Sequence, residues 1–162
     1  TGPIQRTHPM MKLAQHWQRK LDWSIQENVA SDLHKTVRAI KSYIYHVEHE
    51  FEREIDYFHL RGQDNIFRYL PIGRVVVRLH EDDSLFETLA RIAAVKITGC
   101  HLWVSIPKNL SNHVTRFLEG IEGQRIIGKD PVFHERDADL INSLPQVSRI
   151  LYAGPQRVSQ DV

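Results

Sequence analysis

The stretch from residue 74 to residue 107 constrains the fold more than any other part of this sequence. It opens with three β-branched residues in a row, Val75–Val77, a pattern typical of a strand buried on both faces of a parallel sheet. Apolar residues then recur at helical spacing, until Gly99 predicts the end of the helix. A second apolar run begins at His101 and ends at Pro107. A strand, a helix and a strand within about 30 residues are the building block of an open parallel sheet.

The second half of the chain continues this alternation. Asp83 or Ser84 is the expected N-cap of the helix in the opening unit. The later elements, in chain order, are a helix capped by Asn109 or Ser111 and ended by Gly120 and Gly123, a short strand at 125–127, a helix at 137–144 and a strand at 147–152. The pattern therefore predicts a parallel, Rossmann-like sheet with helices on both faces.

The first half of the chain is predicted to be helical. Pro9 suits the first turn of a helix whose apolar face is Met10, Leu13, Trp17, Leu21 and Ile25. Residues 28–30 interrupt that pattern, and Ser31 is the expected N-cap of a second helix. Its apolar stripe is Leu33, Val37, Ile40, Ile44, Val47 and Phe51, with Ile55 as an extension. The two helices are short enough to form an antiparallel pair.

These patterns divide the chain into three parts of an α/β protein. Residues 1–58 form a helical segment, residues 59–73 a polar connector, and residues 74–162 a Rossmann-like domain. The chain starts without methionine and ends after a strand and a turn, so we expect it to be a piece of a longer polypeptide.

Composition narrows the class of partner. The net charge of +1 gives no electrostatic reason to expect nucleic acid as a partner. No run of about 18 apolar residues is present, so we expect no membrane span. Cys100 is the single cysteine, which excludes an intramolecular disulfide and suits a reducing, cytoplasmic location.

Two segments of the second half resemble the nucleotide-binding domain of the aldehyde dehydrogenase superfamily. Residues 93–107 are similar to a family segment that ends in a Lys-Pro pair, and residues 144–155 to one that ends in a Gly-Ser pair. The resemblance implies that the lysine holds the adenosine ribose and that Gly-Ser meets the cofactor's pyrophosphate. Here Ile106 precedes Pro107, and Pro155 follows Gly154. Neither isoleucine nor proline can donate the missing hydrogen bonds, so we expect a nucleotide-binding fold that has lost its cofactor contacts.

Residues 30–155 more specifically resemble the C-terminal part of the bifunctional proline dehydrogenase / 1-pyrroline-5-carboxylate dehydrogenases, the proline utilisation A family. The residues that carry this resemblance are those at 37–51, 60–65 and 68–71. The resemblance implies a parent oxidoreductase of proline catabolism, with FAD in one module and NAD in another. It also implies an extra C-terminal domain that binds no cofactor, contacts the remaining domains of the parent and helps enclose the passage of the intermediate.

Three sets of residues are candidates for chemistry or contact. Cys100 occupies the slot of the family's asparagine and lacks a recognisable base, so we expect a buried, inert thiol. His46 and His49 have no third ligand at a recognisable spacing, so no metal site is predicted. Arg61, Asp64 and Asn65 are the only predicted interaction residues: they form either a contact with the parent enzyme or a self-bonded turn.

The leading hypothesis is therefore a non-catalytic structural domain, with no catalytic, cofactor-binding or metal-binding residues of its own. The alternatives are an NAD-binding aldehyde dehydrogenase module with atypical contacts and an independent helical docking module. Backbone amides at Gly99 or Gly154 could still cradle a phosphate in the first of these alternatives. The sequence does not decide the oligomeric state.

Overall fold

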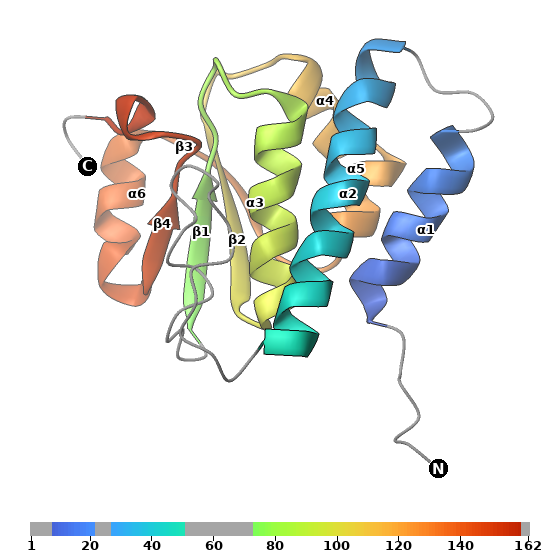
Figure 1. The fold of residues 1–162 in the computed structure, drawn as a ribbon. Coiled ribbons are helices and arrows are strands. Elements are labelled where there is room, and N and C mark those ends of the chain that lie inside the picture. The colour runs from blue at the N-terminus through green and yellow to red at the C-terminus, as the bar shows by residue number, and fades with distance from the viewer. Residues whose placement is uncertain (1–7, 22–26, 51–72, 160–162) are drawn as a thin grey trace.

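The computed structural model, which describes residues 8–21, 27–50 and 73–159, confirms an α/β fold in which a helical pair precedes a parallel sheet (Figure 1). The strands are β1 (Arg74–Arg78), β2 (His101–Pro107), β3 (Val132–Glu135) and β4 (Arg149–Leu151). The helices are α1 (Pro9–Leu21), α2 (Glu27–Glu50), α3 (Leu85–Thr98), α4 (His113–Glu119), α5 (Ile121–Ile127) and α6 (Asp137–Ser143), with 3-10 turns η1 (Leu144–Gln146) and η2 (Pro155–Arg157). The predicted connector at 59–73 lies outside the described residues except for Gly73.

All four strands are parallel, and their order in the sheet is β3-β2-β1-β4. The chain thus builds outward from β1 to β2 and β3, then crosses back to place β4 on the other side of β1. Val76 of β1 is paired with Trp103 of β2 and with Ile150 of β4. The sheet reverses its direction of growth between β1 and β4, and open α/β sheets bind ligands at such a switch point.

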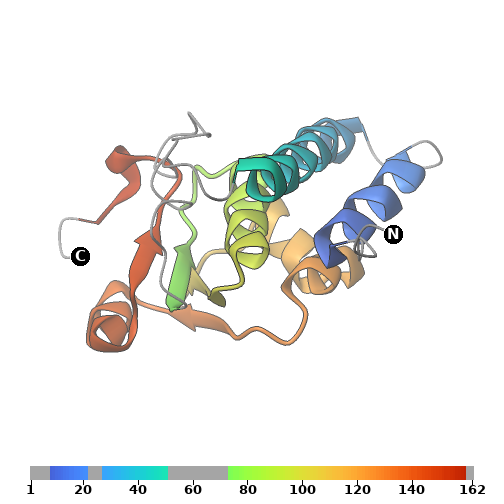
Figure 2. The ribbon, with the colours of Figure 1, turned by 60° about the horizontal axis from the view of Figure 1, so that its bottom comes forward.

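The helices cover the two faces of the sheet unequally. α3 packs on one face, over Val75 and Val77 of β1 and over Leu102 and Val104 of β2, and all four residues are buried in the main core. α4 and α5 continue this layer, whereas α6 lies on the opposite face beside β4 (Figure 2). The prediction of helices on both faces is therefore confirmed.

α1 and α2 belong to the same core as the sheet. The two helices lie side by side in opposite directions, and α2 packs on α3 (Figure 1). Trp17 of α1 and Ile40 of α2 are fully buried, and most other described residues of the apolar stripes are nearly so, whereas Leu21 and Val47 are partly buried. The stripes predicted from the sequence are thus used within the chain, which leaves their apolar surface covered. Ile25, Phe51 and Ile55 lie outside the described residues.

Two sequence signals at the ends of α3 are confirmed. The side chain of Ser84 accepts from the backbone N–H of Glu87, and the Glu87 carboxylate accepts from the Ser84 N–H, which completes a capping box. Ser84 rather than Asp83 is therefore the N-cap. Gly99 ends the helix with a φ of 78°, a left-handed conformation that glycine adopts without strain.

The predicted start of the second helix is wrong. α2 begins at Glu27, so residues 28–30 are helical and Ser31 lies inside the helix instead of capping it. No glycine or proline occurs between Glu27 and Ser31, so nothing in this segment prevents the helix from extending another turn.

The segment from 109 to 127 also differs from the prediction. The N-cap of α4 is Asn112, whose side chain accepts from Val114 N and Thr115 N, rather than Asn109 or Ser111. Residues 125–127 are the last turn of α5 and not a strand. Gly123 does not end a helix, because it lies inside α5, where it lets α5 approach the end of α4.

The third strand was predicted at 125–127 and lies instead at Val132–Glu135. β3 is four residues long and is exposed along most of its length, so it lacks the apolar run that marked β1 and β2. β4 covers residues 149–151, inside the predicted strand at 147–152. The helix predicted at 137–144 is confirmed as α6, with Leu140 buried and Leu144 in the following turn.

Candidate functional site

A cleft of about 600 Å³ lies at the carboxyl ends of all four strands. It is the expected position of a ligand site in an open α/β sheet, because the loops that follow the strands converge there. The cleft is lined by residues 78–81 after β1, residues 107–110 after β2, residues 135–137 after β3, and Tyr152 with residues 156–159 after β4.

The switch point beside this cleft is closed by a buried arginine. Arg91 of α3 is fully buried and donates through Nη1 to the backbone oxygens of Arg78 and Leu151, at 3.0 and 3.2 Å. These oxygens belong to the last residues of β1 and β4. Nη2 of Arg91 donates to Oδ2 of the buried Asp83 at 2.6 Å. One side chain therefore links the two strands between which a dinucleotide fold normally holds its ligand.

A second arginine completes the closure from the C-terminal side. Nη1 of Arg157, in η2, donates to Oδ1 of Asp83 at 2.6 Å and to Oε2 of Glu87 at 2.7 Å. Glu87 and Ser84 also cap the first turn of α3. The N-terminus of α3 thus already has two carboxylates of its own chain beside it, which occupy the place where a helix N-terminus would otherwise attract a phosphate.

The pKa values of the two arginines shift in opposite directions, although both side chains contact the same carboxylates. Burial lowers the pKa of Arg91, and this effect outweighs the opposing charge and hydrogen bond of Asp83. Burial also acts to lower the pKa of Arg157, but its hydrogen bonds to Asp83 and Glu87 outweigh it and raise the pKa. Both guanidinium groups remain charged at neutral pH, so the network is a set of ion pairs.

The floor of the cleft holds a further polar network around Arg78. This side chain is only 4% exposed and donates to Ser105 Oγ at 2.8 Å, to the Glu135 backbone oxygen at 3.1 Å and to Asp137 Oδ1 at 2.9 Å. Ser105 in turn donates to Glu135 Oε1 at 2.6 Å. β1, β2 and β3 each contribute to this network, which uses both Nη1 hydrogens of Arg78 and one Nη2 hydrogen within the chain.

The hydroxyl of Tyr152 lies beside this network and has no hydrogen-bond partner among the described residues. Its oxygen is buried, and burial raises its pKa; the charge of Arg78 lowers the pKa and that of Asp137 raises it further. Because the oxygen is covered, it does not present itself to the open part of the cleft.

Among the described residues, Lys108 and Arg136 supply the unpaired positive charge at the rim of the cleft. Both side chains are exposed, and neither forms an ion pair within that part of the chain. Glu81 is exposed at the same rim and supplies a negative charge. The open part of the cleft is thus bordered by charges of both signs.

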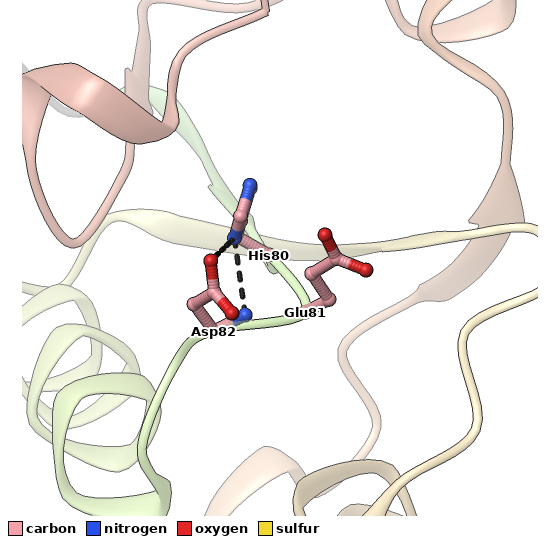
Figure 3. A group of neighbouring side chains, drawn as sticks. All are labelled: His80, Glu81 and Asp82. Atoms are coloured by element: carbon pink, nitrogen blue, oxygen red, sulfur yellow. Dashed lines mark hydrogen bonds and ion pairs between the residues drawn. The ribbon is translucent and has the colours of Figure 1, made fainter.

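The one group of side chains with spacing for a metal ion, within the described part of the chain, is His80, Glu81 and Asp82 (Figure 3). Nδ1 of His80 accepts from the backbone N–H of Asp82 at 3.1 Å and is therefore occupied. Figure 3 shows Asp82 on the Nδ1 side of the ring, with the other ring nitrogen directed away from it. Glu81 and Asp82 are exposed, so we assign no metal to this turn.

The residues singled out from the sequence lie mostly away from the cleft. Cys100 is buried, as predicted, just before β2. His49 is exposed on α2, with its Nδ1 2.8 Å from the Tyr45 backbone oxygen, and His46 is half-buried nearby. Arg61, Asp64 and Asn65 lie outside the described residues.

The two positions where the sequence departs from the aldehyde dehydrogenase pattern flank the cleft. Ile106 is fully buried in the core, and its neighbour Pro107 lines the cleft. Pro155 is the first residue of η2, the turn that carries Arg157 to Asp83. The sequence analysis did not identify Asp83, Arg91 and Arg157 as a group. The one signal it could have used is the position of Arg91 on the apolar side of its helix, which indicates a buried charge that needs a partner.

Comparisons with known proteins do not extend these observations. No helix in the described parts of the chain combines the length and the hydrophobicity needed to cross a bilayer. No protein-family model, curated protein or solved structure matches the chain.

Proposed function

We propose that this chain is a non-catalytic structural domain in the C-terminal part of a bifunctional proline-catabolising oxidoreductase. The parent enzyme converts proline to glutamate through 1-pyrroline-5-carboxylate, with FAD and NAD bound in other domains. The domain contacts those domains and helps enclose the passage of the intermediate.

The observation that carries this proposal is the closed switch point. Asp83 is held by Arg91 from one side and by Arg157 from the other, each at 2.6 Å. A dinucleotide at this place would have to displace Arg157 and bring its phosphates against Asp83 and Glu87. Displacing Arg157 would leave Glu87 and one oxygen of the buried Asp83 without their partner, and nucleotide binding would have to offset that loss.

The two departures from the family pattern support the same function. Ile106 has no donor for a ribose, and its buried side chain contributes to the core. Pro155 has no N–H for a pyrophosphate, and its ring starts the turn that positions Arg157. Both residues serve the stability of the fold where the family pattern has cofactor contacts.

Titration of the 162-residue chain with NAD tests the loss of the cofactor site. We expect no saturable heat in calorimetry and no change in melting temperature at millimolar NAD. Arg157→Ala is the informative variant, because it opens the switch point without restoring the donors at 106 and 155, and it should also fail to bind. Saturable binding to the unaltered chain would favour the NAD-binding module instead.

The structural role is tested in the parent enzyme. Removal of this domain should leave both half-reactions active when each is assayed with its own substrate. The coupled conversion of proline should then show a lag in NADH formation, because the intermediate escapes to solvent. If the deletion produced no lag, or abolished the dehydrogenase half-reaction, the result would contradict the proposed role.

A further inference from the structure

The cleft extends beyond the closed switch point. Arg91 and Arg157 fill the seam between β1 and β4, whereas β2 lies on the other side of β1. The cleft continues over that side, where residues 107–110 and 135–137 line it. Its volume of about 600 Å³ lies in the usual range of small-molecule sites, about 300–1,000 Å³. The part over β1 and β2 therefore has room for a ligand while Arg157 stays paired with Asp83.

Arg78, on the floor of the cleft, has hydrogen-bond donors to spare. Its Nη1 hydrogens go to Ser105 and to the Glu135 backbone oxygen, and one Nη2 hydrogen goes to Asp137. The Nε–H and the second Nη2 hydrogen have no acceptor in the described part of the chain. Because Ser105 belongs to β2, the guanidinium reaches from β1 toward β2. A carboxylate is a group that such arginine donors bind well.

The charges around the cleft nearly cancel. The ionised side chains that line it are four basic and three acidic ones: Arg78, Lys108, Arg136 and Arg157, and Glu81, Glu135 and Asp137. Just outside the lining, Asp83 and Glu87 pair with Arg157, and the exposed Asp139 accepts from the Arg136 N–H. His80 adds no charge while its Nδ1 accepts from the Asp82 N–H. The net charge therefore favours neither a purely anionic nor a purely cationic ligand.

Two unpaired charges of opposite sign lie over adjacent strands. Lys108 directly follows β2 and Glu81 lies in the turn after β1; both are exposed, and neither has an ion-pair partner in the described ranges. Figure 3 shows Glu81 directed away from Asp82. β1 and β2 pair with each other, and neighbouring strands lie about 4.8 Å apart. Lys108 and Glu81 do not pair across this distance, so both charges are available to a ligand between them.

We propose that the cleft binds a small zwitterionic peptide. Its carboxylate lies on Lys108 and the spare donors of Arg78, and its ammonium group lies on Glu81. This proposal goes beyond the proposed function and does not rest on it.

A dipeptide fits this arrangement better than a single amino acid. An extended dipeptide is about 7 Å long, which suits charged partners on adjacent strands. Its peptide group meets the exposed side chains of Asn109 and Gln156, which line the cleft and have no hydrogen-bond partner among the described residues. Leu110 and Val158 offer apolar contact to its side chains. A free amino acid would leave most of the cleft unfilled.

NMR titration of the isotope-labelled chain with the dipeptide Ala-Leu tests the proposal. Two capped forms are the comparison: acetyl-Ala-Leu lacks the ammonium group, and Ala-Leu-amide lacks the carboxylate. We expect Ala-Leu to give saturable shifts of the Glu81, Lys108 and Asn109 amides. Each capped form should bind about fivefold more weakly, because one exposed charge pair is lost.

Two variants assign the two ends of the peptide. Lys108→Met should weaken binding of Ala-Leu about fivefold and leave binding of Ala-Leu-amide unchanged. Glu81→Gln should weaken binding of Ala-Leu similarly and leave binding of acetyl-Ala-Leu unchanged. Both side chains are exposed, so the fold should persist. Lys129→Met and Glu119→Gln, exposed and outside the cleft, are the matched controls and should bind like the unaltered chain.

The results that would overturn the proposal are equally definite. Equal binding of the three peptides would show that the charged ends are not recognised. Saturable shifts confined to residues outside the cleft, or no saturable shift at tens of millimolar Ala-Leu, would show that the cleft is not the site. Control variants that weaken binding as much as Lys108→Met and Glu81→Gln would reduce the effect to overall charge.

Discussion

The indole nitrogen of Trp17 donates to Oε2 of Glu122 at 2.7 Å, and this bond joins two residues that are 105 positions apart in the chain. Lys20 also donates to the same carboxylate, at its other oxygen. A single acidic side chain of α5 thereby holds α1 against the sheet domain. The N-terminal helices are part of one cooperative structure with the sheet.

Glu122→Ala should destabilise the protein by about 1–3 kcal/mol, because the buried Trp17 N–H loses its acceptor. Urea unfolding followed by circular dichroism measures this change. Glu119→Ala, at the exposed end of α4, is the control and should change the unfolding free energy by less than about 0.5 kcal/mol. Equal effects of the two substitutions would show that the bond contributes nothing.

Glu122 should also make stability depend on pH in the acid range. Burial acts to raise its pKa, but the hydrogen bonds from Lys20 and Trp17 outweigh burial and hold the pKa below its ordinary value of 4.5. The stabilisation is therefore present above pH 4.5 and is lost as pH falls through the lower folded-state pKa. Unfolding curves of Glu122→Gln should lack this component, and an identical acid profile for variant and parent would contradict the assignment.

His8 should contribute a second pH dependence, near neutrality. Its Nδ1 accepts from the Met10 N–H at the start of α1, which requires the unprotonated ring nitrogen. Burial lowers the pKa of His8 below 6.5, and the charge of Glu48 only partly opposes this. The cap therefore stabilises α1 above pH 6.5 and is lost as pH falls through the folded-state pKa. His8→Asn keeps a capping side chain and should flatten the stability profile between pH 7 and pH 5, which thermal melts can measure.

Arg91 and Asp83 should be strongly coupled. Asp83→Asn leaves the buried Arg91 without its carboxylate and should cost about 3–5 kcal/mol of stability. Arg91→Ala leaves Asp83 paired with Arg157 alone and opens a buried site, so it should also be strongly destabilising. The double variant should cost clearly less than the sum of the two, as measured in a double-mutant cycle by urea unfolding. Arg149→Ala, on the exposed side of β4, is the control and should be nearly neutral. Additive losses would show that the two side chains act independently.

Tyr152→Phe should be neutral or stabilising. The substitution keeps the ring and removes a buried hydroxyl that has no partner in the described part of the chain. Differential scanning calorimetry against Tyr45→Phe, an exposed tyrosine on α2, checks this expectation. A loss of more than about 1 kcal/mol would mean that the hydroxyl forms a bond in solution.

The sequence predicted those parts of the fold in which local pattern and tertiary environment agree. Val75–Val77 form a buried strand, and Ser84 and Gly99 bound α3, because each of these residues meets a local backbone requirement. The prediction failed where tertiary contacts determine the secondary structure. Ile126 and Ile127 look like a strand but pack as the last turn of α5.

The closed switch point had one local signal, the position of Arg91 on the apolar side of its helix, and nothing in the sequence linked that residue to Arg157. Asp83 and Arg157 are 74 positions apart, and only the return of the chain from β3 across the sheet to β4 brings them together. The position of β3 could not be predicted either, because an exposed edge strand needs no run of apolar residues. Both features depend on topology rather than on the composition of any one segment.

The bonds from Arg91 to the last carbonyls of β1 and β4 bear on the structural role proposed for this chain. A nucleotide-binding domain that opens to admit its ligand has at least two conformations. Here the Arg91 side chain joins the last residues of β1 and β4, so we expect a single conformation at the switch point. A fixed conformation would suit the structural role proposed above.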